Sequence, residues 1–125
     1  MRTSELAGAL GLSVEQGEYE DRAVSGGYTS DLLSDVMANA KADSVLITIQ
    51  AHKNTVAVAS LVGLAAIVVC NGRPVPADMT EAAKAEGVAV FRAEATQFEI
   101  SGRLWSALAG PGGGAADAGR GRDRG

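Results

Sequence analysis

A short polar segment, residues 48–55, lies between two strongly apolar stretches of the sequence. Its polar residues are Thr48, Gln50, His52, Lys53, Asn54 and Thr55. Because amide side chains both donate and accept hydrogen bonds, Gln50 and Asn54 could recognise a polar ligand, and Lys53 at a helix start could hold a negative group. A simpler interpretation, in which Asn54 or Thr55 only caps that helix, explains these two residues equally well.

His52 is the only histidine in the chain. A metal site with two histidines is therefore excluded, and a catalytic pair would need a serine or cysteine brought close by folding, which no motif marks. A surface histidine in a loop is the favoured interpretation. The single cysteine, Cys70, ends an apolar run and lacks a partner at metal-site or redox spacing, which indicates a small buried residue. We identify no catalytic residue and no metal site.

A second candidate site surrounds two adjacent glycines. It reads Ser25-Gly26-Gly27-Tyr28-Thr29-Ser30-Asp31. Glycine permits backbone angles that other residues avoid, and hydroxyls beside the free amides of a helix start suit an anion or a phosphate. The segment has neither the Gly-Lys-Ser/Thr of a P-loop nor the three spaced glycines of a dinucleotide site. A tight turn, followed by a helix cap at Thr29 or Ser30, is the competing interpretation.

The polar segment 48–55 is expected at one edge of a buried sheet. Residues 45–49 and 66–70 predict two strands, with a helix from residue 54 or 55 to about 62 between them. Both strands are almost entirely apolar, which is typical of parallel strands covered by helices on both faces. Ligands of open α/β sheets bind outside the carboxyl ends of such strands.

The remaining segments alternate between helix and strand. Helices are predicted at residues 4–10, 32–40, 78–86 and 96–108, and short extended segments at 12–14, 22–24 and 88–91. Helix starts are indicated by Ser4 and by two capping-box pairs, Asp78 with Glu81 and Thr96 with Glu99, and helix ends by Gly11, Gly63 and Gly87. The predicted fold is one compact three-layer α/β domain with a mostly parallel central sheet covered by helices.

Composition narrows the class of protein. The chain has 125 residues, 46% of them hydrophobic, and a formal net charge of -4, which argues against nucleic-acid binding. The apolar run 56–70 is shorter than the roughly twenty residues of a membrane-spanning helix. No signal peptide is evident, so a cytoplasmic protein is expected.

Residues 1–109 form the predicted domain, and residues 110–125, rich in Gly and Arg, are expected to be a disordered tail.

The order of three segments resembles the DRTGG domain family. These segments are Gly26-Gly27-Tyr28-Thr29-Ser30-Asp31-Leu32-Leu33-Ser34, Val45-Leu46-Ile47-Thr48-Ile49-Gln50, and Asn54 followed by Val56-Ala57-Val58-Ala59. The resemblance covers roughly residues 4–108 and is strongest to stand-alone bacterial versions, although Ser25-Gly26-Gly27-Tyr28-Thr29 stands where other members carry Asp-Arg-Thr-Gly-Gly. In larger proteins the domain accompanies CBS domains of regulated pyrophosphatases, and related segments occur in phosphotransacetylases and beside HPr kinase catalytic domains.

This resemblance implies a non-catalytic regulatory or ligand-sensing module, homodimeric, that binds a small anionic metabolite or nucleotide, a partner protein, or both. No cofactor is expected; an adenine nucleotide or a phosphorylated metabolite is the ligand class considered. A pocket would require Tyr28, Ser30, Gln50 and Asn54 to converge. Two alternatives stay open: a phosphotransfer or serine-kinase-related enzyme subunit using His52 with Asp31 or Lys53, and a purely structural interaction protein.

Overall fold

Five strands form one sheet in the computed structural model, which describes residues 1–110. The strands are β1 (Ser13–Gln16), β2 (Gly26–Thr29), β3 (Ser44–Thr48), β4 (Ala66–Val69) and β5 (Ala89–Arg92), and their order across the sheet is β1-β5-β4-β3-β2. β2 to β5 run parallel, and β1 pairs antiparallel with β5. Except for Gly110, the predicted tail lies outside the described residues.

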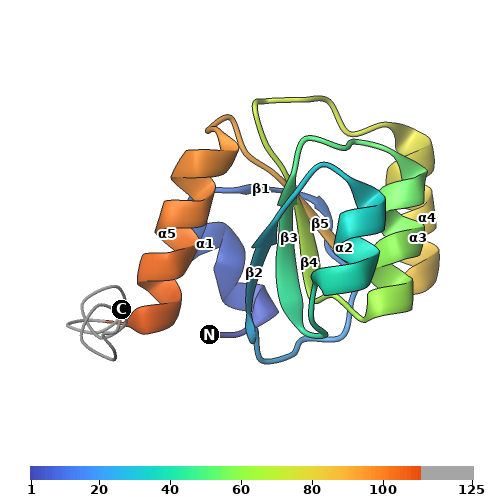
Figure 1. Cartoon of the computed structure of the whole chain (residues 1–125). Helices are drawn as coiled ribbons and strands as arrows, with labels where there is room; N and C mark the ends of the chain where they lie inside the picture. Colours follow the sequence, from blue (N-terminus) through green and yellow to red (C-terminus); the bar gives the residue numbers. More distant parts are fainter. Residues whose placement is uncertain (111–125) are drawn as a thin grey trace.

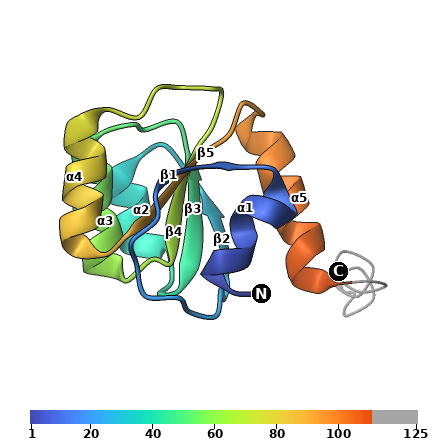
Figure 2. The ribbon, with the colours of Figure 1, turned by 180° about the vertical axis from the view of Figure 1, so that it is seen from behind.

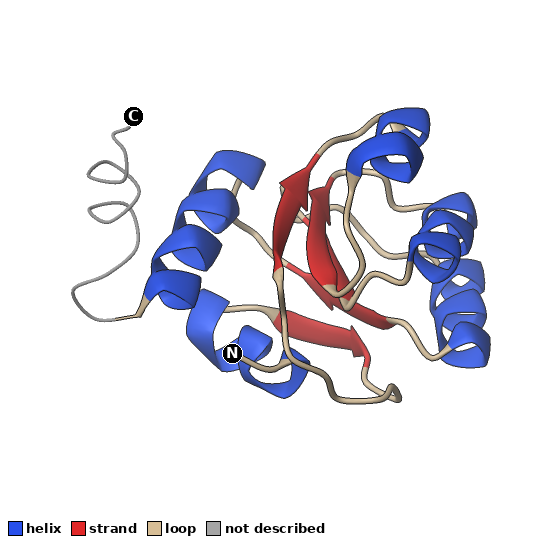
Figure 3. Ribbon diagram, turned by 60° about the horizontal axis from the view of Figure 1, so that its bottom comes forward, coloured by secondary structure: helices blue, strands red, loops and turns tan. Residues whose placement is uncertain are grey.

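Helices cover both faces of the sheet (Figures 1 and 2). α2 (Leu33–Asn39), α3 (Lys53–Val62) and α4 (Ala77–Glu86) lie on one face, and α1 (Leu6–Leu10) and α5 (Gln97–Ala109) lie on the other. A short 3-10 turn, Thr3–Glu5, precedes α1. Figure 3 shows the strands between the two helical layers. The predicted three-layer α/β fold is confirmed. None of the described helices has the length and apolar character needed to cross a membrane.

The side chains of β3 explain why the middle of this strand is apolar without interruption. Val45 and Ile47 belong to the core beneath α1 and α5, whereas Leu46 belongs to the core beneath α2, α3 and α4. All five residues of β3 are buried. Because successive side chains of a strand point to opposite faces, a strand covered on both faces is apolar at successive positions, and the polar residues Ser44 and Thr48 stand only at the two ends of β3.

The structure confirms the predicted helix ends more often than the predicted helix starts. Gly11, Gly63 and Gly87 adopt left-handed backbone angles directly after α1, α3 and α4, as predicted. At the start of α5, Thr96 and Glu99 form the expected capping box. These five residues fix where three of the helices end and where α5 begins.

Three other predicted caps are wrong. The Ser4 amide and hydroxyl donate to the Asp21 carboxylate and cap no helix. α4 begins at Ala77 with Pro76 as its N-cap, so Asp78 lies in the first turn and forms no capping box. α3 is capped by His52, whose Nδ1 accepts from the Asn54 amide at 3.0 Å, and not by Asn54 or Thr55. At the start of α4, the fixed φ angle of Pro76 takes the place of the expected side-chain cap. At the start of α3, the ring nitrogen of His52 accepts the hydrogen bond that Asn54 or Thr55 was expected to accept.

The predicted glycine turn is also wrong, because Gly26, Gly27, Tyr28 and Thr29 form the edge strand β2. The expected strand at residues 22–24 is reduced to one isolated bridge between Ala23 and Arg2. Neither Thr29 nor Ser30 is the N-cap of α2, which is Leu32. Gly27 is required for packing rather than for turning: a Cβ there would lie 2.6 Å from Leu104 Cδ2 on α5.

Candidate functional site

Asp31 joins three elements at the carboxyl edge of the sheet. Its Oδ1 atom accepts hydrogen bonds from the Thr48 hydroxyl at 3.0 Å, from the Ile49 amide at 2.9 Å and from Gln97 Nε2 at 2.9 Å. These donors are the last residue of β3, the residue that follows it, and the first residue of α5. A single carboxylate oxygen therefore holds the segment that follows β2 against the end of β3 and the start of α5.

Gln50 and Thr55 extend this network toward α3. Gln50 Nε2 donates to the Asp31 carbonyl at 2.9 Å, and the Gln50 amide donates to the Thr48 hydroxyl at 3.1 Å. The buried Thr55 hydroxyl donates to the Gln50 carbonyl at 2.9 Å. The two segments considered as candidate sites thus meet, with Asp31, Thr48, Gln50 and Thr55 bonded to one another.

Sequence reasoning missed Gln97, which lies 66 positions from Asp31. The available signal was the Thr96 capping box, which places a helix start immediately before Gln97. The buried hydroxyls of Thr48 and Thr55 both find acceptors in this network, which is what buried polar groups need for a stable fold. The arrangement is therefore a structural joint between the strand ends and α5.

Tyr28 and Asn54 do not join this network. The Tyr28 hydroxyl donates to both carboxylate oxygens of Asp35 at 2.9 Å, and Asn39 Nδ2 donates to the same carboxylate at 2.8 Å. Hydrogen bonds from Ser30, Asn39 and Tyr28 hold the pKa of Asp35 below its usual range, and the bond to Asp35 raises the pKa of Tyr28. The convergence of Tyr28, Ser30, Gln50 and Asn54 into one pocket is not observed.

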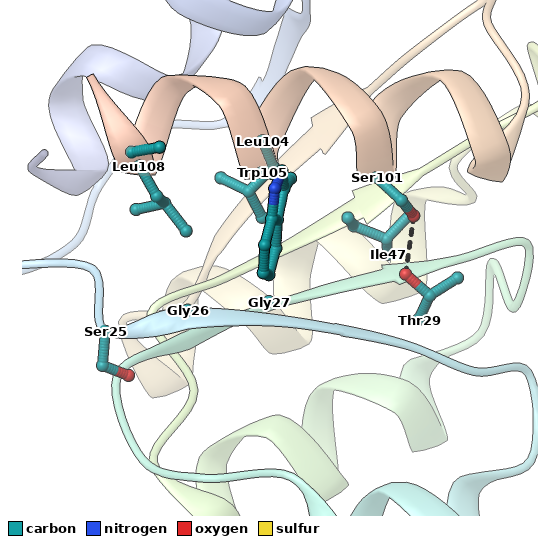
Figure 4. A pocket seen from close by; sticks show the side chains of 10 residues that line it. Ser25, Gly26, Gly27, Thr29, Ile47, Ser101, Leu104, Trp105 and Leu108 are labelled. Atoms are coloured by element: carbon teal, nitrogen blue, oxygen red, sulfur yellow. Dashed lines mark hydrogen bonds between the residues drawn. The ribbon is translucent and has the colours of Figure 1, made fainter. Parts of the chain in front are cut away.

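A groove lies elsewhere, between α5 and the edge strand β2 (Figure 4). Its volume is about 590 Å³, within the range typical of small-molecule sites. Gly26, Gly27 and Thr29 form its floor with Ile47, and its walls are Ser25, Ser101, Leu104, Trp105, Leu108 and Ala109. Gly26, Gly27 and Thr29, three of the predicted site residues, therefore line this groove. The residues of the network at Asp31 do not line it.

One aromatic side chain and the paired hydroxyls of Thr29 and Ser101 give the groove its chemistry. Trp105 is 53% exposed and extends from α5 toward β2 (Figure 4). Thr29 Oγ1 and Ser101 Oγ lie 2.7 Å apart and share a hydrogen bond in which either can donate. None of the described residues lining the groove is Lys or Arg. The groove therefore suits a flat apolar ring with a polar edge better than a phosphate.

Cys70 lies at the end of β4 and is fully buried, as predicted. Burial, together with the charge of Asp31, raises the pKa of its thiol to about 11 from an ordinary value of 9.0. The thiolate is the reactive form, so we expect native protein to resist iodoacetamide near pH 7.5 and unfolded protein to react readily. Mass spectrometry of both samples measures this; rapid labelling of native protein would contradict the burial.

The same shift affects stability at high pH. Between about pH 9 and pH 11 the unfolded thiol ionises while the folded thiol stays protonated, so the Cys70 contribution to stability is lost as pH rises through this window. Chemical unfolding of wild type and Cys70→Ala over this window should therefore give a smaller pH dependence for the variant. Equal pH dependence would contradict the raised pKa.

No protein-family model matches the sequence, and no curated protein matches it. Among the described residues, no group of three or more His, Cys, Asp or Glu side chains could hold a metal ion. A solved structure does match: the CBS and DRTGG domains of the regulatory region of Clostridium perfringens pyrophosphatase, in complex with its activator, diadenosine tetraphosphate. The TM-score is 0.63 and the sequence identity 12%.

This match covers 81% of the present chain and 44% of the pyrophosphatase chain, so the protein spans less than half of its match. At such low identity the likeness concerns the fold. The chain therefore shares its fold with part of a regulatory region that contains CBS and DRTGG domains, which confirms at the level of the fold the resemblance predicted from the sequence.

Proposed function

We propose that this chain is a non-catalytic regulatory module that senses a small ligand with a planar ring, such as the base of a nucleotide, in the groove between β2 and α5. The observation that carries the proposal is the half-exposed Trp105 indole beside a floor formed by glycine backbone and the Ile47 side chain. A ring stacked on an indole gains both apolar burial and favourable aromatic geometry.

The hydroxyl pair supplies the polar end of such a site. Thr29 and Ser101 can each donate or accept, so they can bond to ring nitrogens or exocyclic amines at the edge of a base. Because no cation lines the groove among the described residues, a phosphate would stay in solvent. A nucleoside and its monophosphate are therefore expected to bind with similar affinity, in contrast to the anion site considered from the sequence.

The fold likeness supports a regulatory role, since the similar region of the pyrophosphatase is regulatory and was solved with an adenine dinucleotide. The enzyme alternative has less support. His52 uses Nδ1 to accept the Asn54 amide, and Asp31 Oδ1 already accepts three hydrogen bonds. Neither side chain has the partner that nucleophilic or phosphoryl-transfer chemistry needs.

Trp105, the only tryptophan, makes the ligand proposal directly testable. Adenosine, AMP and diadenosine tetraphosphate would each be titrated while indole fluorescence is recorded. We expect quenching by all three, and a stabilisation of about 2.7 kcal/mol at one hundred times the dissociation constant. Ser101→Ala should weaken binding several-fold, whereas Ser60→Ala, which removes a helix hydroxyl on the opposite face, should not. Unchanged fluorescence across the panel would rule out the ring site.

A further inference from the structure

The loop that follows β4 contains the only Asn-Gly pair of the chain, Asn71-Gly72. This pair is chemically labile, because glycine has no Cβ to hinder its backbone nitrogen when that nitrogen approaches the carbonyl carbon of the asparagine side chain. Asn39 and Asn54 are followed by alanine and threonine, which hinder the same approach. The reactive pair is therefore confined to one position, just beyond the carboxyl end of β4.

The pair forms a tight turn. The φ angle is 63° at Asn71 and 61° at Gly72, and the Arg73 amide donates to the Cys70 carbonyl at 3.3 Å, which is the pattern of a type I′ turn. Asn71 is exposed, so water reaches its side chain. The carbon that would be attacked is accessible, and the reaction then depends on the Gly72 nitrogen.

The Gly72 nitrogen is restrained by the segment 93–95. Its N–H donates to the Ala93 carbonyl at 2.8 Å, and the Asn71 amide donates to the Ala95 carbonyl at 2.9 Å. A nitrogen that donates such a bond keeps its proton and cannot attack until the bond opens. The Glu94 carboxylate lies over the turn, since a Cβ added at Gly72 would lie 2.7 Å from Glu94 Oε1. Its negative charge further disfavours an amide anion.

Arg92 holds the turn by its carbonyls. Its Nε donates to the Arg73 carbonyl at 3.1 Å, and its Nη2 donates to the Gly72 carbonyl at 2.9 Å. The same Nη2 lies 2.9 Å from the Glu94 carboxylate. Because the planar guanidinium contacts both carbonyls and the carboxylate at once, the turn opens only when several of these bonds break together.

We propose that Asn71 is a deamidation site whose rate is set by Arg92 and the segment 93–95, which keep the turn closed. When the turn opens, base from solvent removes the Gly72 amide proton, and the nitrogen bonds to Asn71 Cγ. The Cγ–Nδ2 bond then breaks, Nδ2 takes up protons and leaves as ammonia, and a succinimide remains. Water opens this ring at either carbonyl, which gives aspartate or isoaspartate. Ligand binding in the groove is not required for this reaction.

The products would weaken the connection between β4 and α5. Isoaspartate carries the main chain through its side-chain carboxyl, so the turn gains one main-chain carbon and loses the register of its bonds to Ala93 and Ala95. Ala95 directly precedes the Thr96 cap of α5, so the isolated isoaspartate form should unfold at a lower urea concentration than unmodified chain. Asn71→Asp adds the charge without the extra carbon and should lose less stability.

Peptide mapping by mass spectrometry tests the site in the full chain, incubated at mildly alkaline pH either folded or unfolded in urea. We expect conversion at Asn71 ahead of Asn39 and Asn54, and a rate about tenfold or more lower in the folded chain. Arg92→Ala should speed conversion in the folded chain several-fold. Arg73→Ala is the matched control, because it removes an exposed guanidinium and keeps the carbonyl that Arg92 contacts.

Arg92→Lys keeps the charge and loses the planar fork, so its rate should lie between those of wild type and Arg92→Ala. Circular dichroism checks that each variant is folded during the incubation. Equal rates in folded and unfolded wild type would overturn the proposal, whatever the variants do. So would faster conversion at Asn39 or Asn54 than at Asn71, or folded Arg92→Ala and Arg92→Lys that convert no faster than Arg73→Ala.

Discussion

Asp31→Ala is expected to lower the free energy of unfolding by about 2–4 kcal/mol, measured by urea denaturation at pH 7 and fixed protein concentration. The substitution removes the acceptor of three hydrogen bonds at once, from Thr48, Ile49 and Gln97. Thr48 is completely buried, so its hydroxyl would lose an acceptor without gaining water. A buried polar group left without a partner costs more than the net value of the bond itself.

Two variants separate this explanation from a general effect of removing charge. Asp31→Asn keeps an oxygen at the accepting position, so it should lose roughly half as much stability as Asp31→Ala. Asp78→Ala removes an exposed carboxylate from the first turn of α4 and should cost only a few tenths of a kcal/mol. If Asp31→Ala proved as mild as Asp78→Ala, the network would not hold the strand ends together.

The sequence predicts the centre of the fold well because burial on both faces leaves a direct signal. The apolar run of β3 is buried at every position, and Gly63 has the predicted left-handed backbone after α3. Such features depend on local chemistry: a strand between two layers needs apolar residues, and a left-handed residue is best filled by glycine.

The candidate site was less predictable because its residues depend on distant neighbours. Gly26 and Gly27 favour a turn by propensity, yet they lie in the edge strand β2, and α5 packs closely on Gly27. The Gln97 side chain reaches Asp31 only because α5 packs on the sheet, and no local pattern in the sequence encodes that contact. Trp105 is half exposed and lines a groove whose floor comes from β2, far away in the sequence.

Leu104→Ala should have the largest effect, a loss of about 2–5 kcal/mol in the free energy of unfolding. Leu104 is 2% exposed, packs on β2 and lines the groove, so its removal leaves a cavity between α5 and the sheet. Trp105 fluorescence should shift to longer wavelength in the folded variant, because the groove beside the indole becomes wetter. Leu61→Ala, which truncates a leucine that is 72% exposed on α3, is the matched control and should change stability little.

A double-mutant cycle with Gly27 tests the packing itself. Gly27→Ala alone places a methyl group 2.6 Å from Leu104 Cδ2 and should cost about 1–3 kcal/mol through overpacking. In Leu104→Ala that methyl group enters the space left by the leucine, so the double variant should be more stable than the sum of the single losses predicts. Strictly additive losses would mean that Gly27 and Leu104 are not in contact, and that close approach of α5 does not explain the glycine in β2.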